Sequence, residues 1–237
     1  MPGLSKERRE SLRRNVLKLR KIVEAAYAKK LKGMGFFAEC SKKHVHEKSC
    51  YIKFQKPSEE QRTILEYIKR EARGFEDLSE AERIGKAILR YQKACAYTLI
   101  NRLCALKALE VRGLFPETVT KRGKYGGLSQ REYQIREKNP GIAPDKLIYE
   151  ALILGFKEAK AEIPLLFEEK PYGHLYPSPY ELREVISILN DEIKEDDWLS
   201  DDILGFIYQF YNEEERRAYR SGRGKGKRKA PEQMIYP

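Results

Sequence analysis

The stretch from Ser79 to Gly113, SEAERIGKAILRYQKACAYTLINRLCALKALEVRG, is predicted to form one uninterrupted helix. Ser79 and Glu82 have the spacing of a capping box, apolar residues then recur at steps of three and four, and Gly113 offers a stop. A helix of this length spans about 50 Å, which is more than the width of a small domain. From Ala94 to Leu106 it is apolar nearly all round, so we expect other helices to bury it on several sides.

Two polar residues, Asn101 and Arg102, lie inside this apolar run. An arginine is almost never fully buried unless it is paired. We therefore expect Arg102 to have a carboxylate or a row of carbonyl oxygens as its partner, and to play a structural role.

The net charge of +11 is concentrated at the two ends of the chain. Residues 1–32 hold eleven Lys/Arg and three Glu, residues 216–229 hold eight Lys/Arg and no acid, and the middle is mildly acidic. Such ends favour polyanions, above all nucleic acid, although a solvated helix face and a soluble tail have the same composition. The candidate DNA-binding residues are Arg8, Arg9, Arg13, Arg14, Arg216, Arg217, Arg220, Arg223, Lys225, Lys227, Arg228 and Lys229.

The chain divides into a basic N-terminal helix (1–35), a helical core domain (36–215) and a flexible basic linker or tail (216–237). The first helix is predicted to be capped by Ser5. Its apolar seam has the spacing of a coiled coil, which favours docking on the core over a free partner-binding arm. The seam residues are Leu12, Val16, Leu19, Val23 and Ala26.

Further helices are predicted to begin at Ser58, at Pro144, at Ser178 and at Ser200. The last, SDDILGFIYQFYNEEERRAYR, carries a large aromatic face, and its Gly205 would let another helix approach closely. Residues 114–143 are polar and rich in turn formers, which predicts a surface excursion. The fold class is therefore all-α, a multi-helix bundle around one long central helix, with at most a small β-hairpin near residues 36–56.

Four potential metal ligands, Cys40, His44, His46 and Cys50, lie within that possible hairpin. They could close a tetrahedral zinc site, but their C-x3-H-x-H-x3-C spacing is not a usual zinc pattern. A polar loop or hairpin with solvent-facing histidines is the favoured alternative, so no metal is expected.

No catalytic constellation is present in residues 1–237. There is no H-E-x-x-H sequence and no nucleophile elbow, and the glycines at 222, 224 and 226 lack the strand and helix of a nucleotide-binding loop. The chain also lacks an apolar signal core and a run of eighteen apolar residues, which predicts a cytoplasmic protein without a membrane partner. The residues alone thus indicate a helical binding or scaffolding module.

Two blocks carry a resemblance to a known family: YTLINRLCALKALEVRG at 97–113 and WLSDDILGFIYQFY at 198–211. They resemble the FNRLvALRymE…G and eiiGWlYQyY blocks in the N-terminal helical region of PglX-like, BREX-type adenine-specific DNA methyltransferases and of related fused restriction–modification enzymes. Ile100 replaces the usual Phe and Phe206 the usual Trp, and both keep apolar bulk. The matching block residues, expected to be structural, include Asn101, Arg102, Glu110, Gly205 and Tyr208.

The resemblance implies the N-terminal, non-catalytic part of a phage-defence enzyme that methylates adenine in DNA. Its partners would be DNA and either a C-terminal methyltransferase domain or other defence-system proteins. S-adenosylmethionine would belong to that domain, because its (N/D)-P-P-(Y/F) motif does not occur here: Asn139-Pro140 is followed by Gly141. The chain would then be a fragment or a separately encoded piece. Two alternatives are a stand-alone nucleic-acid-binding helical protein and a protein–protein adaptor.

Overall fold

The structure is a computed structural model that describes residues 4–40, 51–169 and 171–222. Within these residues, β structure is limited to two isolated antiparallel bridges, Phe36–Ile52 and Arg122–Leu128, so the all-α prediction is confirmed. No helix in the described part of the chain is both long and apolar enough to cross a membrane. The helical elements are α1 (Lys6–Gly33), α2 (Glu59–Ala72), α3 (Glu80–Val111), a 3-10 turn (Gly123–Tyr125), α4 (Gln130–Lys138), α5 (Pro144–Glu162), α6 (Pro164–Phe167), α7 (Pro179–Ser187), a π turn (Ile188–Glu192), α8 (Glu195–Trp198), α9 (Ile203–Tyr211) and α10 (Glu213–Gly222).

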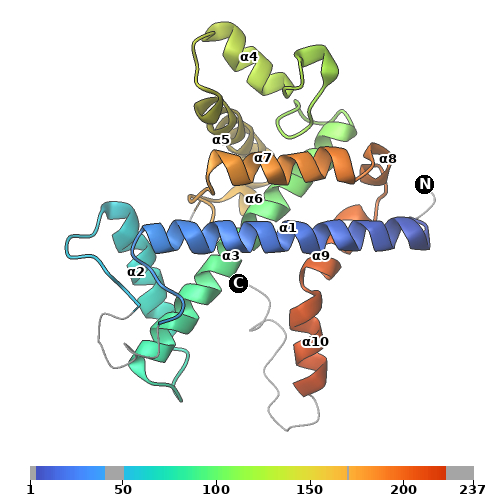
Figure 1. The fold of residues 1–237 in the computed structure, drawn as a ribbon. Coiled ribbons are helices and arrows are strands. Elements are labelled where there is room, and N and C mark those ends of the chain that lie inside the picture. The colour runs from blue at the N-terminus through green and yellow to red at the C-terminus, as the bar shows by residue number, and fades with distance from the viewer. Residues whose placement is uncertain (1–3, 41–50, 170, 223–237) are drawn as a thin grey trace.

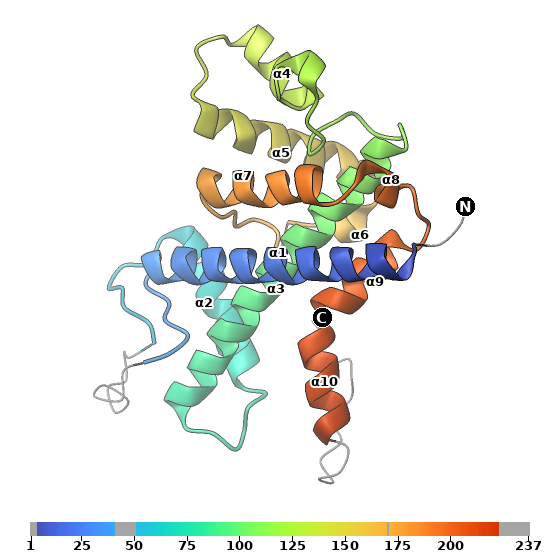
Figure 2. The same ribbon diagram turned by 45° about the vertical axis from the view of Figure 1, so that its right-hand side comes forward.

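Helix α3 is the centre of the molecule, as predicted. Ser79 and Glu82 form the expected capping box, and the helix ends before Gly113, whose φ is +70°. α1 crosses its middle, α2 packs on its first half, and α6, α8 and α9 contact it as well (Figures 1 and 2). These neighbours explain why so much of α3 is buried.

Helix α1 docks on the core through its apolar seam, which confirms the favoured interpretation. The Ser5 hydroxyl accepts a hydrogen bond from the backbone N–H of Arg8 at the predicted cap. All five seam residues are buried, and the helix packs against α3, α7 and α9.

Arg102 is anchored by carbonyl oxygens, one of the two kinds of partner expected for it. Its Nε donates to Leu166 O at 2.8 Å and its Nη1 to Gly173 O at 2.9 Å, while Nη2 donates to Glu168 O. The side chain is buried, and this burial lowers the pKa of Arg102. The central helix is thereby tied to the end of α6 and to the chain that follows it.

The prediction that residues 114–143 form a surface excursion is wrong in large part, because the segment forms α4 and contributes buried residues. The Glu110 carboxylate on α3 accepts backbone hydrogen bonds from Thr118, Val119 and Thr120 at 2.7–3.1 Å. Ser129 then caps α4. A buried acid near the end of the preceding helix thus supplies the acceptors that hold a polar segment against the core.

The prediction of a single last helix is also wrong, because the chain forms two helices, α9 and α10, that meet at the buried Asn212. Asn212 Nδ2 donates back to Tyr208 O, which also accepts the helical hydrogen bond from the Asn212 backbone N–H. α9 is preceded by Asp202 and not by Ser200, and α10 projects away from the body (Figures 1 and 2). Among the described residues nothing lies within 4 Å of a Cβ placed on Gly205, so the expected close helix contact is absent there.

Candidate nucleic-acid interface

The four predicted arginines of the N-terminal cluster lie on the first half of α1, and neighbours already engage three of them. Arg8 forms an ion pair with Asp197. The Arg9 guanidinium lies 5.7 Å from the centre of the Phe206 ring. Arg14 is exposed.

Arg13 joins α1 to the start of α10. Its Nε lies 2.7 Å from Glu213 Oε2, and its Nη2 lies 2.9 Å from Oε1. Glu10 approaches the same guanidinium at 3.7 Å. The hydrogen bond between the partners raises the pKa of Arg13 and lowers the pKa of Glu213. The two ends of the described chain are therefore held together by a bidentate ion pair.

A second tie, which the sequence did not indicate, involves the buried Arg20. Its Nη1 donates to Tyr211 O at 2.6 Å and to Glu215 Oε2 at 2.7 Å, and Lys93 on α3 approaches Glu215 at 3.4 Å. Burial alone would lower the pKa of Arg20, but the hydrogen bond and charge of Glu215, with Glu24 nearby, raise it. α10 is thus fixed at its base by charged groups on both α1 and α3.

Arginines from the two ends of the chain meet in a pocket of about 420 Å³, which we call the arginine pocket. Arg216 is half-buried, whereas Arg217 and Arg220 are exposed. The pocket holds four arginines and two glutamates, so its net charge is positive. Its lining residues are Glu10, Arg13, Gln209, Phe210, Glu213, Arg216, Arg217 and Arg220.

The arginine side chains of this pocket have the chemistry that suits phosphate groups. A guanidinium presents a fork of N–H donors that matches a phosphate in a bidentate manner. In the structure the N–H donors of the Arg13 guanidinium are hydrogen-bonded to the Glu213 carboxylate, and Arg217 also forms an ion pair with Glu213. A phosphate entering the pocket would therefore compete with this carboxylate.

Several predicted site residues remain untested by the described part of the chain. Arg223, Lys225, Lys227, Arg228 and Lys229 lie outside it, and their role in DNA binding stays a prediction. His44, His46 and Cys50 also lie outside it, while Cys40 is disulfide-bonded. No group of three potential metal ligands occurs among the described residues.

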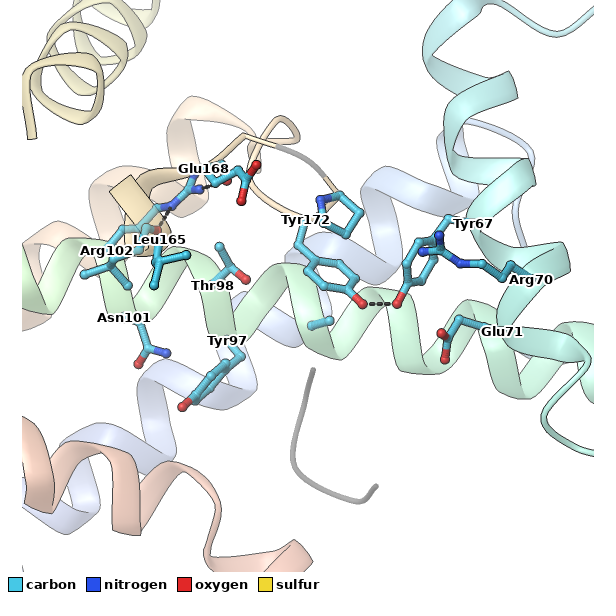
Figure 3. A pocket seen from close by; sticks show the side chains of 13 residues that line it. Tyr67, Arg70, Glu71, Tyr97, Thr98, Asn101, Arg102, Leu165, Glu168 and Tyr172 are labelled. Carbon is cyan, nitrogen blue, oxygen red and sulfur yellow. Dashed lines mark hydrogen bonds between the residues drawn. The ribbon is translucent and has the colours of Figure 1, made fainter. Parts of the chain in front are cut away.

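The residues of the two resemblance blocks have separate positions. Arg102 anchors α3 by donating hydrogen bonds to three carbonyl oxygens. Glu110 accepts backbone hydrogen bonds from residues 118–120. Tyr208 is 41% exposed on α9, with its ring 6.2 Å from that of Tyr97. Asn101 lines a second pocket, of about 510 Å³, which is shown in Figure 3. Sequence reasoning missed this pocket, because its walls come from three separate segments with no common local pattern.

No family model matches the chain, and no solved structure matches it. Among curated proteins, it is 31% identical over 145 residues to the adenine-specific methyltransferase BrxX of Escherichia coli O9:H4 (strain HS), covering 52% of this chain and 12% of that protein. It is 28% identical over 170 residues to the adenine-specific methyltransferase PglX of Lacticaseibacillus casei (strain Zhang), covering 60% and 14%. The chain is thus related in sequence to the BREX-type adenine-specific methyltransferases and spans a small part of their length.

Proposed function

We propose that this chain is a non-catalytic helical domain of a BREX-type adenine-specific DNA methyltransferase, and that it helps to hold DNA. The relation to BrxX and PglX supports the parent activity. The sequence contains no (N/D)-P-P-(Y/F) motif to grip an adenine, which supports a non-catalytic role. S-adenosylmethionine would be bound by the methyltransferase domain, and phage defence would be the task of the parent system.

The observation that carries the DNA-binding part is the arginine pocket. Arg13 from α1 and three arginines from α10 converge there, on a helix that projects from the body (Figure 2). Contacts between arginines and phosphates are indifferent to sequence and weaken as salt rises, because DNA binding releases counterions. We therefore assign the pocket to the backbone of DNA and not to its base edges.

The test is a salt titration of the binding of a fluorescent DNA duplex, followed by anisotropy. Each phosphate that a variant no longer neutralises should flatten the slope of log K against log salt by about 0.9. We expect a flatter slope when Arg216, Arg217 and Arg220 are replaced by Gln. The matched control replaces three lysines of α5, Lys146, Lys157 and Lys160, by Gln, and should keep the original slope.

Two further variants separate the contributions of the chain ends. Deletion of residues 223–237 tests the basic tail, and replacement of Arg8, Arg9, Arg13 and Arg14 by Ala tests the start of α1. Equal slopes for all variants would mean that these charges only solvate the protein. The adaptor alternative would then be favoured, since α9 exposes Leu204 and Tyr208 (43% and 41% exposed) as a surface for a protein partner.

The non-catalytic part of the proposal has its own test. The chain alone should give no saturable heat of binding with S-adenosylmethionine in isothermal titration calorimetry, and no methyl transfer to DNA. Saturable binding at micromolar affinity would overturn that part and leave the DNA-binding part standing.

A further inference from the structure

The pocket of about 510 Å³ lies along the side of α3 between α2 and residues 165–168 and 171–172 (Figure 3). We call it the tyrosine pocket, because Tyr67, Tyr97 and Tyr172 line it from three different segments. Thr98 and Asn101 line it from α3, and Leu165, which is 92% exposed, stands at its rim.

Tyr67 and Tyr172 form a preorganised aromatic wall. Their hydroxyl groups share a hydrogen bond, and their rings meet edge to face with centres 5.1 Å apart. Both rings also contact the buried ring of Tyr91, whose centre lies 5.3 Å from that of Tyr67 and 5.7 Å from that of Tyr172. The Arg70 guanidinium lies 4.9 Å from the centre of the Tyr67 ring. Because these rings support one another, a ligand that stacks here does not have to order them first.

Two arginines and two glutamates line the pocket (Arg70, Arg102, Glu71 and Glu168), so their charges balance and suit a ligand with little charge of its own. Glu71 is ion-paired with Arg90 at 3.1 Å, and the Arg102 guanidinium is used by three carbonyl oxygens. Asn101 and Thr98 supply an amide and a hydroxyl group within the pocket. A planar, neutral ring system with hydrogen-bonding edges, such as a nucleobase, matches this combination of aromatic faces and neutral polar groups.

Helix α9 links the tyrosine pocket to the arginine pocket. The ring centres of Tyr208 and Tyr211 lie 6.2 and 5.4 Å, respectively, from the ring centre of Tyr97. The intervening residues Gln209 and Phe210 line the arginine pocket. The same helix thus contacts a lining residue of the tyrosine pocket and itself lines the arginine pocket.

We propose that the tyrosine pocket receives an unstacked nucleobase of a DNA strand whose phosphates lie in the arginine pocket. This inference rests on the proposed function and adds a second, uncharged contact to it. Stacking on tyrosine tolerates every base, because each base has an aromatic face. The pocket would therefore add affinity for unpaired DNA without reading its sequence.

The test compares two fluorescent single strands that carry the same charge: a short oligothymidylate and an abasic strand of equal length. Binding to the whole 237-residue chain is followed by anisotropy. We expect the strand with bases to bind about tenfold more tightly, the effect of one stacked base. Tyr172→Leu should abolish most of this difference, whereas Tyr133→Leu, at an exposed tyrosine that lines neither pocket, should preserve it.

A second measurement does not depend on the folding of a variant. A strand containing 5-iodouracil is irradiated with the wild-type chain, and the cross-linked peptides are identified by mass spectrometry. Cross-links at Tyr67, Tyr97 or Tyr172 support the proposal, and cross-links confined to other tyrosines overturn it.

The outcomes separate this proposal from the proposed function. If both strands bind with equal affinity, the nucleobase site is overturned while DNA binding stands. The tyrosine pocket would then be a site for an aromatic side chain of a protein partner. If neither strand nor duplex binds at low salt, the DNA-holding function falls and the nucleobase site falls with it.

Discussion

Arg13 and Glu213, two hundred residues apart, share a bidentate ion pair with N–O distances of 2.7 and 2.9 Å. The pair places the start of α10 beside the first half of α1, where Arg216 and Arg220 help to line the same pocket. It also puts a carboxylate where the proposed function places a phosphate of DNA. The pair therefore organises the arginine pocket and lowers its positive charge.

Replacement of Glu213 by Gln should strengthen DNA binding. The change removes one negative charge from the arginine pocket and frees the fork of Arg13 for a phosphate. We expect tighter binding at low salt and a slope of log K against log salt that steepens by up to about 0.9. The measurement is the same anisotropy titration on duplex DNA. Glu162→Gln, at an exposed acid on α5, is the matched control, and equal or weaker binding by Glu213→Gln would contradict the prediction.

Arg102→Ala should destabilise the fold strongly. The change leaves three carbonyl oxygens without their charged donor and opens a cavity in the core. Loss of one side of a buried charged interaction costs about 3–5 kcal/mol in the free energy of unfolding. Urea denaturation followed by circular dichroism measures the loss. Arg70→Ala, at an exposed arginine, should change the stability by much less. An Arg102→Ala protein that unfolds like wild type but binds DNA poorly would make the residue functional.

Gly173→Ala should act through the same anchor. A Cβ at position 173 would lie 2.2 Å from Arg102 Nη1 and Nη2, so the guanidinium would have to leave its carbonyl partners. We expect the losses from Gly173→Ala and Arg102→Ala to be far from additive, because both remove the same set of hydrogen bonds. A double-mutant cycle in urea denaturation measures this coupling, and simple additivity would contradict it.

The buried Lys107 should make stability depend on alkaline pH. Its Nζ donates to Asn190 Oδ1 at 2.8 Å, and burial lowers the pKa of Lys107 from 10.5 to about 8. The unfolded chain holds this proton up to a higher pH than the folded chain, so the contribution of Lys107 to stability rises between about pH 8 and pH 10.5. The full rise is about 3 kcal/mol. Urea denaturation across this range should show it relative to Lys107→Met, and parallel profiles for the two proteins would contradict it.

Structural features that depend on residues within one or two helical turns of each other could be predicted from the sequence. The caps at Ser5, Ser58 and Ser79 depend on hydrogen bonds between residues three apart, and all three occur as expected. The apolar seam of α1 and the run from Ala94 to Leu106 showed which surfaces are buried. They could do so because the helical repeat places these residues on defined faces, whatever packs against them.

Other local signals were present but were outweighed by composition or by context. Ser129 and Glu132 form a capping box, yet the polar residues around them hid α4. The repeat from Ile203 to Tyr219 suggests one helix, while the backbone turns at Asn212. That turn lets Arg13 and Arg20 of α1 pair with Glu213 and Glu215, two contacts that no local pattern encodes.

The sequence by itself determined the helical class, the central helix, the docking face of α1, the need of Arg102 for a polar partner and the basic character of both chain ends. Only the tertiary structure decided which residues meet. It supplied carbonyl oxygens to Arg102, joined Glu110 to the backbone at 118–120, and gathered arginines and tyrosines from distant segments into two pockets. The reason is physical. A helix and its caps form from neighbours along the chain, whereas a site forms from groups whose proximity depends on how every helix packs.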